Sequence, residues 1–157
     1  MRIGIITDSH DHKENLKKAV EIFNNAKVDK VLHAGDLVAP FTKRELGNLA
    51  MPLVCVFGNN DGERLGLKQA FGEIYVPPLA MTIDGRKIVL MHEPDNLEAV
   101  TESGHFDVVI YGHTHNIDIR REKSLIFNPG ESCGWLTGKS HIAVLDLKTL
   151  RHELIEL

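Results

Sequence analysis

A chain of 157 residues is long enough to bury a hydrophobic core in one domain. Its 43% hydrophobic and 25% charged residues are typical of soluble globular proteins, and its formal net charge of −4 provides no basic surface for a long nucleic acid. No apolar run approaches the ~20 residues that a membrane span needs, and no signal-peptide pattern is visible. We therefore expect a cytoplasmic protein without membrane contact, and buried thiols at Cys55 and Cys133.

Residues 1–60 alternate between strand and helix patterns. Short apolar runs predict strands over 2–7, 30–34 and 53–57. Residues 13–26 repeat apolar side chains at helical spacing, and a second helix is expected over 40–49, where proline is suited to the first helical position. This strand–helix–strand–helix–strand order favours parallel pairing with right-handed crossovers.

The second half of the chain predicts antiparallel pairing. Asp84-Gly85 is a hairpin turn signal between two apolar runs. A short helix is expected over 96–103. Strands are expected over 80–83, 87–91, 106–111, 118–121, 125–127, 142–147 and 153–157. No repeat or linker divides the chain, so residues 1–157 are expected to form one mixed α/β domain.

Polar side chains follow five of the predicted strands. They are Asp8, His10, Asp36, Asn59, His92, His113 and His115. Because ligands of open α/β sheets bind beyond the carboxyl ends of the strands, these side chains are expected to converge. Seven ligands exceed the needs of one tetrahedral ion and suit two ions that share a bridging ligand. Mixed nitrogen and oxygen donors favour manganese, iron, cobalt, nickel or zinc over magnesium or calcium.

The same positions resemble the ordered motifs of the calcineurin-like metallophosphoesterases. The matching segments are Asp8-Ser9-His10, Gly35-Asp36, Gly58-Asn59-Asn60-Asp61, His92 and Gly112-His113-Thr114-His115. The compact size and Asn128-Pro129-Gly130 resemble the small YfcE-type phosphodiesterase branch. The resemblance implies two mixed β-sheets packed as a sandwich with flanking helices. It also implies two divalent metal ions per chain, with manganese or nickel as the first choice and iron, cobalt or zinc as alternatives.

The resemblance implies a role for each of these side chains. One ion would bind Asp8, His10, Asp36 and His115, and the other would bind Asp36, Asn59, His92 and His113. Asp36 would bridge the two ions, and a hydroxide held between them would attack phosphorus in line. Asp36, Asn59 and His10 are the residues expected to lie at the reacting centre, where the Asn59 amide can also orient the substrate.

The motifs depart from the family pattern at two positions. Many relatives have a histidine where this chain has Asn60, and asparagine cannot donate a proton to the leaving group. General acid catalysis typically contributes about 10²–10⁴-fold, so we expect a preference for diesters with good leaving groups. His12 or His33 is the alternative acid, although His33 is better suited to supporting the ligands. Glu93 follows His92 where relatives often have glycine, which would alter the shape of that loop.

Two alternatives to a phosphodiesterase remain at this point. The retromer subunit of similar fold is a non-catalytic protein-binding scaffold, but its pattern lacks the histidine that His10 supplies here. A phosphomonoesterase or nuclease of the same superfamily is the other alternative, although a long nucleic-acid substrate does not suit the charge. A small phosphodiester is the expected partner, and the oligomeric state, a homo-oligomer included, stays open. Trp135 and Phe41 are interpreted either as core residues or as the lining of a pocket or interface.

Overall fold

The computed structural model describes residues 1–157. One sheet contains β1 (Arg2–Ile6), β2 (Lys30–His33), β3 (Leu53–Val56), β4 (Ile74–Tyr75), β10 (His141–Asp146) and β11 (His152–Glu156). The other contains β5 (Leu79–Ile83), β6 (Arg86–Leu90), β7 (Val108–Ile110), β8 (Ile117–Arg121) and β9 (Leu125–Pro129). The α-helices are α1 (Lys13–Ala26), α2 (Lys43–Leu46), α3 (Arg64–Phe71) and α4 (Leu97–Glu102).

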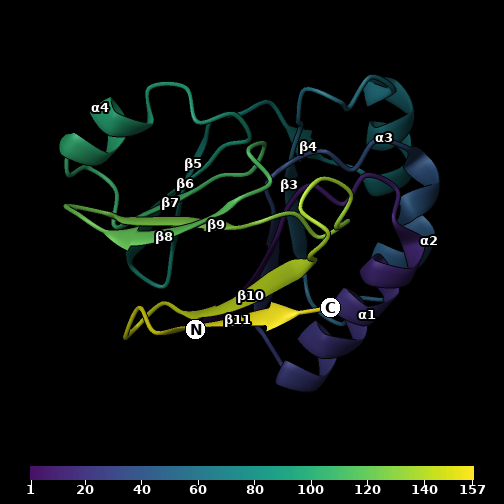
Figure 1. Ribbon diagram of the computed structural model, residues 1–157, viewed down its shortest axis with the longest axis horizontal. Coiled ribbons are helices and arrows are strands. Elements are labelled where there is room, and N and C mark those ends of the chain that lie inside the picture. The colour runs from purple at the N-terminus through teal and green to yellow at the C-terminus, as the bar shows by residue number, and fades with distance from the viewer.

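The two sheets face each other between helical layers (Figure 1). Their strand orders are β11-β10-β1-β2-β3-β4 and β5-β6-β7-β9-β8. Helices α1, α2 and α3 cover the outer side of the first sheet, and α4 lies against the second (Figure 1). This arrangement confirms the predicted sandwich of two mixed sheets with flanking helices.

Local sequence patterns explain the first sheet and its helical cover. Strands β1, β2 and β3 pair in parallel, as the alternation of strands and helices predicts. Helix α1 buries Leu16, Ala19, Val20 and Phe23, which recur at the helical spacing and pack against the sheet. Fully burying an aliphatic or aromatic side chain of this kind contributes about 1.5–3 kcal/mol, so the packed face explains why this helix forms here.

A second hydrophobic core between the sheets places the functional loops. Ile5 and Leu32 from the first sheet share this core with Leu90, Ile110 and Phe127 from the second. Strands β6 and β7 pair in parallel, with Leu90 opposite Ile110, just as Ile5 stands opposite Leu32 between β1 and β2. Because these strands end in register, the loops that follow them emerge at one edge of the sandwich.

Three local elements differ from the sequence prediction. The helix expected over 40–49 is a 3₁₀ turn over Pro40–Thr42 followed by α2, which ends at Leu46. Asn48 ends it, because the Asn48 side-chain amide donates to the carbonyls of Arg44 and Glu45. Helix α3 and strand β4 were not predicted. Only Leu67 of α3 is buried, so the helix lacks an apolar stripe, and β4 is two residues long.

Both cysteines are buried free thiols, as expected. Burial and the neighbouring Glu131 carboxylate raise the pKa of Cys133 to about 12, so this thiol is not a reactive thiolate at neutral pH. None of the helices is long and apolar enough to cross a membrane.

Candidate metal centre

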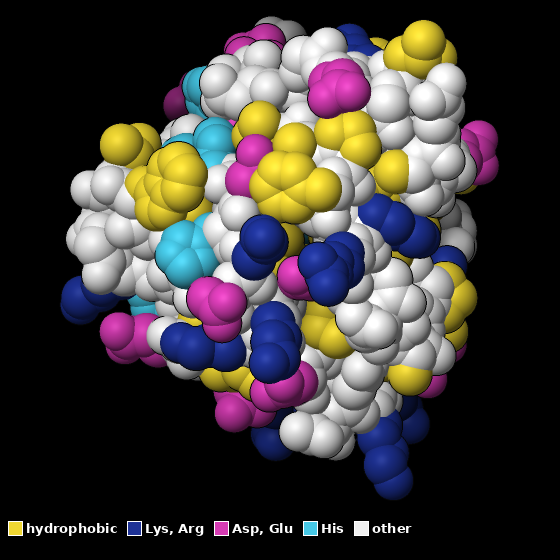
Figure 2. Space-filling view, turned by 90° about the vertical axis from the view of Figure 1, so that its right-hand side faces the viewer, with side chains coloured by type: hydrophobic (Ala, Val, Ile, Leu, Met, Phe, Trp, Pro, Cys, Tyr) yellow, Lys and Arg dark blue, Asp and Glu magenta, His cyan; other side chains and the backbone are white.

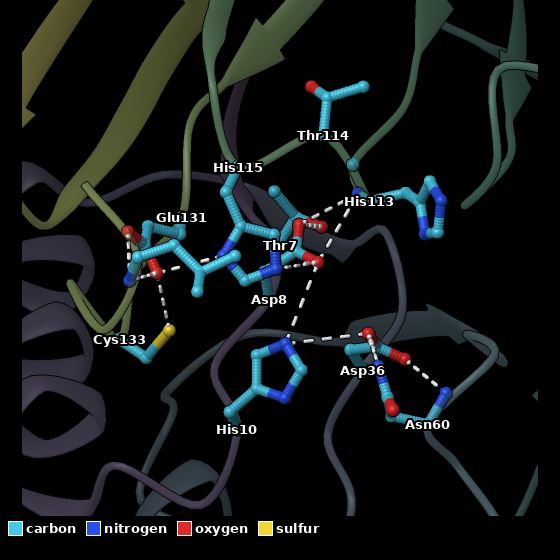
Figure 3. A network of polar contacts seen from close by, with 12 residues as sticks. Thr7, Asp8, His10, Asp36, Asn60, His113, Thr114, His115, Glu131 and Cys133 are labelled. Atoms are coloured by element: carbon cyan, nitrogen blue, oxygen red, sulfur yellow. Dashed lines mark hydrogen bonds and ion pairs between the residues drawn. The ribbon is translucent and has the colours of Figure 1, made fainter.

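The seven predicted side chains come together at the edge where the parallel strands end. Asp8 and His10 follow β1, Asp36 follows β2, Asn59 follows β3, His92 follows β6, and His113 and His115 follow β7. Backbone hydrogen bonds join neighbouring loops within each sheet, since Asp8 N donates to Gly35 O and Gly112 N donates to His92 O. Between the sheets, His113 N donates to Asp8 Oδ2 at 3.0 Å. Figure 3 shows the resulting cluster, with His10, His115 and Asp36 pointing toward a common centre.

The Asp36 carboxylate lies in the middle of the cluster. Its Oδ2 is 3.4 Å from His10 Nε2 and 3.3 Å from His92 Nε2. Burial acts to raise the pKa of Asp36, but the hydrogen bond and charge of His92 and the donors of Asn60 outweigh it and hold the pKa well below its ordinary value. Asp36 is therefore an anion at neutral pH, facing an imidazole on each side.

The other side chains divide into two groups around Asp36. On one side, Asp8 Oδ1 lies 3.4 Å from His115 Nε2 and 3.9 Å from His10 Nε2. On the other side, Asn59 Oδ1 lies 2.8 Å from His92 Nε2 and 2.9 Å from His113 Nδ1. The two groups share Asp36 and no other side chain.

Donor and acceptor roles in the cluster fit divalent cations. His10 Nε2 is buried and has no hydrogen-bond partner, which is rare for a buried polar atom. His92 Nδ1 donates to Ala34 O at 2.8 Å, so Nε2 carries a lone pair toward the centre whenever the ring holds a single proton. That lone pair faces Asn59 Oδ1, another acceptor, at 2.8 Å. Lone pairs that converge in this way repel one another unless a proton or a cation lies between them, and the nitrogen and oxygen donors suit a transition-metal ion.

Five of the seven side chains are attached to backbone with positive φ. The angles are 50° at Asp8, 37° at His10, 60° at Asp36, 66° at His113 and 59° at His115. Residues other than glycine rarely adopt a positive φ, and each instance costs roughly 1–3 kcal/mol. Such strain concentrates at sites where the surrounding structure holds a side chain in a working position.

Two motif glycines make room for the carboxylates. A Cβ atom on Gly112 would lie 2.6 Å from Asp8 Oδ2, and one on Gly58 would lie 2.1 Å from Asp36 Oδ1. Any other residue at these positions would displace the carboxylates, so the glycine before each ligand-bearing segment follows from close packing.

Asn60 and Asp61 hold the loop that carries Asp36. Asn60 donates from its backbone N to Asp36 Oδ1 at 2.9 Å and from Nδ2 to Asp36 Oδ2 at 2.8 Å. The buried Asp61 carboxylate accepts from the backbone N of Asp36, Val38 and Gly58 at 2.7–3.1 Å. Asp61 therefore joins the loops after β2 and β3.

His33 was predicted either to support the ligands or to act as the general acid, and its contacts fit the supporting role. Its ring is fully buried, Nδ1 accepts from Gly35 N at 3.2 Å, and Nε2 pairs with Ser9 Oγ at 3.1 Å. Burial lowers the pKa of His33 to about 3, so the ring is neutral at physiological pH. A neutral ring that is fully buried does not suit the alternative role as a general acid. His12 caps α1 through Nδ1, which accepts from Asn15 N at 3.3 Å.

Glu131 is a further residue of the site that the sequence analysis missed. Its buried carboxylate accepts from His115 Nδ1 at 2.8 Å and from Cys133 Sγ (Figure 3). It also accepts from Trp135 N at 2.9 Å. Burial acts to raise the pKa of Glu131, but these donors and those of Thr137 hold it at about 2. Because the anion binds the Nδ1 proton, His115 Nε2 presents its lone pair to the centre. Glu131 follows β9, which pairs in parallel with β7, and this pairing was not predicted.

This fold is that of a phosphoesterase family. The model of the calcineurin-like phosphoesterase superfamily domain matches residues 1–150. The chain belongs to this superfamily, which confirms the resemblance found in its motifs.

Several known proteins are similar to the chain along its length. Phosphodiesterase MJ0936 of Methanocaldococcus jannaschii is 41% identical, and the match covers 100% of this chain and 99% of the relative. The solved structure of an archaeal phosphodiesterase, also 41% identical, has a TM-score of 0.94 with all of both chains covered. YfcE, a phosphoesterase from E. coli, has a TM-score of 0.76 at 20% identity over 99% of this chain and 98% of its own. Vps29 of Chaetomium thermophilum has a TM-score of 0.73 at 18% identity over 100% and 94%. The last two likenesses concern the fold alone.

Proposed function

We propose that this protein is a metal-dependent phosphodiesterase with a dinuclear centre and a small phosphodiester substrate. The observation that carries the proposal is the position of Asp36 Oδ2, which lies 3.4 Å from His10 Nε2 and 3.3 Å from His92 Nε2. A single carboxylate in contact with two ligand groups suits a bridge between two ions. The phosphodiesterase relative that matches the whole chain supports the same reaction class.

Two sets of side chains that share Asp36 would each hold one ion. Asp8, His10, Asp36 and His115 would form one group, and Asp36, Asn59, His92 and His113 would form the other. Manganese or nickel suits these nitrogen and oxygen donors. When bound, two such ions would supply a hydroxide nucleophile and neutralise charge on the phosphate oxygens.

In this proposal, Asp36, Asn59 and His10 are the residues that lie at the reacting centre. Asp36 sets the spacing of the two groups, and Asn60 fixes both of its carboxylate oxygens. Hydrolysis of a diester joins a water oxygen to phosphorus and releases an alcohol that must acquire a proton. Asn60 cannot supply that proton, and its Nδ2 is already bonded to Asp36. The proposed preference is therefore for diesters whose leaving group departs as a stable anion.

The proposal is tested by turnover of aryl diesters and monoesters with metal-stripped protein, to which each divalent ion is returned separately. We expect hydrolysis of bis(4-nitrophenyl) phosphate to return with manganese or nickel, and 4-nitrophenyl phosphate to be cleaved more slowly. Absence of turnover with every ion would leave the protein-binding scaffold as the better account. A preference for the monoester would contradict the role inferred from Asn60.

We expect Asn60→His to raise monoesterase activity at least about tenfold relative to diesterase activity. A histidine could donate a proton to the leaving group, a contribution that reaches about 10²–10⁴-fold where the acid is well placed. Asn60→Ala is the control, because it removes the same bond to Asp36 without adding an acid. The two activities are measured on the monoester and the diester of unsubstituted phenol, a leaving group that benefits from protonation more than 4-nitrophenol does. An identical ratio for the histidine and alanine variants would rule out leaving-group protonation at this position.

A further inference from the structure

We infer that Trp135 forms a binding subsite for an aromatic substituent of the substrate, such as a nucleobase or an aryl ring, beside the metal centre. This inference rests on the proposed phosphodiesterase function and adds the chemical class of the substrate. Neither the motifs nor the proposed ligands include Trp135, which lies in the loop between β9 and β10.

The Trp135 ring is exposed although it is next to the centre. Its side chain is 65% exposed, so the interpretation as a core residue is wrong. The ring centroid lies 6.3 Å from that of His10 with an interplanar angle of 27°, a stacked arrangement. The His12 ring is 6.4 Å away and tilted. Part of the indole therefore lies beside a proposed metal ligand, while most of its surface is open to solvent.

The backbone of this loop is held in place, so the exposure of Trp135 is built into the fold. Trp135 N donates to the buried Glu131 carboxylate at 2.9 Å. Cys133 N donates to Asp8 O at 3.2 Å, and the Asn15 side-chain amide donates to Ser132 O at 2.8 Å. This loop is anchored to β1 and α1, and it presents a large apolar ring to water. A smaller polar residue at this position would expose less apolar surface.

The position of the ring favours an aromatic group attached to phosphate. An ester held at His10 would have its substituent within reach of an indole 6.3 Å away. Aromatic rings and nucleobases stack on tryptophan, and the stacking depends little on which base is present, because every base has a π-face. On the face of the molecule that carries the helices, Lys and Arg side chains are interspersed with Asp and Glu, and hydrophobic side chains lie beside histidines (Figure 2). That mixed charge suits a small ester better than a long polyanion.

A comparison of two diesters that share one leaving group distinguishes the effect of stacking on Trp135 from the effect of the bond-breaking step. Thymidine 5′-(4-nitrophenyl phosphate) and methyl 4-nitrophenyl phosphate release the same phenolate, and only the first carries a nucleobase. For the metal-loaded protein we expect kcat/KM to be at least about tenfold higher for the thymidine ester, mainly through KM. Trp135→Ala should remove this preference, and Trp135→Phe should retain most of it. Leu136→Ala is the matched control, since Leu136 is 76% exposed on the same loop.

An equal preference in the native protein and in Trp135→Ala would overturn the subsite while leaving the proposed function intact. Binding provides a second test that does not need turnover, because Trp135 is the sole tryptophan of the chain. We expect thymidine 5′-monophosphate to change the tryptophan emission of the metal-loaded protein saturably, and methyl phosphate to leave it nearly unchanged. Identical responses to the two ligands would overturn the inference even if neither diester were hydrolysed.

Discussion

Asp36→Ala is expected to abolish the binding of two ions per chain and to lower diesterase activity by more than about 100-fold. Removing residues that merely support metal ligands costs about 10–100-fold in metal affinity or activity, and a shared ligand should cost more. Asp36 is in contact with both ligand groups, through His10 and through His92. Its loss would also leave the Asn60 donors without their acceptor. Metal content is measured by elemental analysis after equilibration with manganese, and activity on bis(4-nitrophenyl) phosphate.

Two further variants separate bridging from folding. Asp36→Asn keeps the shape of the side chain and removes its charge, so it should fold and still lose the second ion. Asp95→Asn removes a carboxylate from an exposed position outside the centre and should keep both ions. Retention of two ions per chain in Asp36→Ala would contradict the proposed bridge.

Glu131→Gln is expected to weaken binding of one ion by about 10–100-fold and to lower activity similarly. The Glu131 carboxylate binds the Nδ1 proton of His115 at 2.8 Å and so aims Nε2 at Asp8. Glutamine is neutral, and its amide group cannot accept from all the donors that the carboxylate now satisfies. The loss should be confined to the ion bound through His115, because Asn59, His92 and His113 make no contact with Glu131. Stepwise metal titration by calorimetry resolves the two affinities.

A matched variant distinguishes positioning of His115 from disorder of the loop. Thr137→Val removes the hydroxyl that donates to Glu131 Oε1 at 2.7 Å and leaves the pair between Glu131 and His115 in place. This variant should lose thermal stability but keep the affinity for both ions. Equal weakening of both ions in Glu131→Gln, or the same weakening in Thr137→Val, would count against the positioning role.

Local sequence patterns predicted much of the centre because each ligand follows a strand. Asp8, Asp36 and Asn59 follow apolar runs of the first sheet, and such runs are recognisable without knowledge of the fold. The rule that ligands bind beyond the carboxyl ends of parallel strands then predicts their convergence. Helix α1 was predicted with its observed bounds for a similar reason, since its apolar stripe is long and regular.

Features that depend on tertiary pairing were not predicted. Glu131 reaches His115 because β9 lies parallel to β7, a pairing between strands separated by β8 in the sequence. The bonds from Asn60 to Asp36 depend on how the loops after β2 and β3 approach each other. The exposure of Trp135 depends on a loop held by backbone donors to one buried carboxylate, and no periodic pattern in the sequence signals that geometry.

The central claim is that seven side chains hold two ions that share Asp36. Anomalous diffraction from crystals of the manganese-loaded protein tests it most directly, because it locates each ion without reference to activity. The proposal predicts two peaks, each about 2.0–2.3 Å from its ligands. One should lie among Asp8, His10, Asp36 and His115, and the other among Asp36, Asn59, His92 and His113. A single peak, or two peaks that do not share Asp36, would contradict the proposed centre.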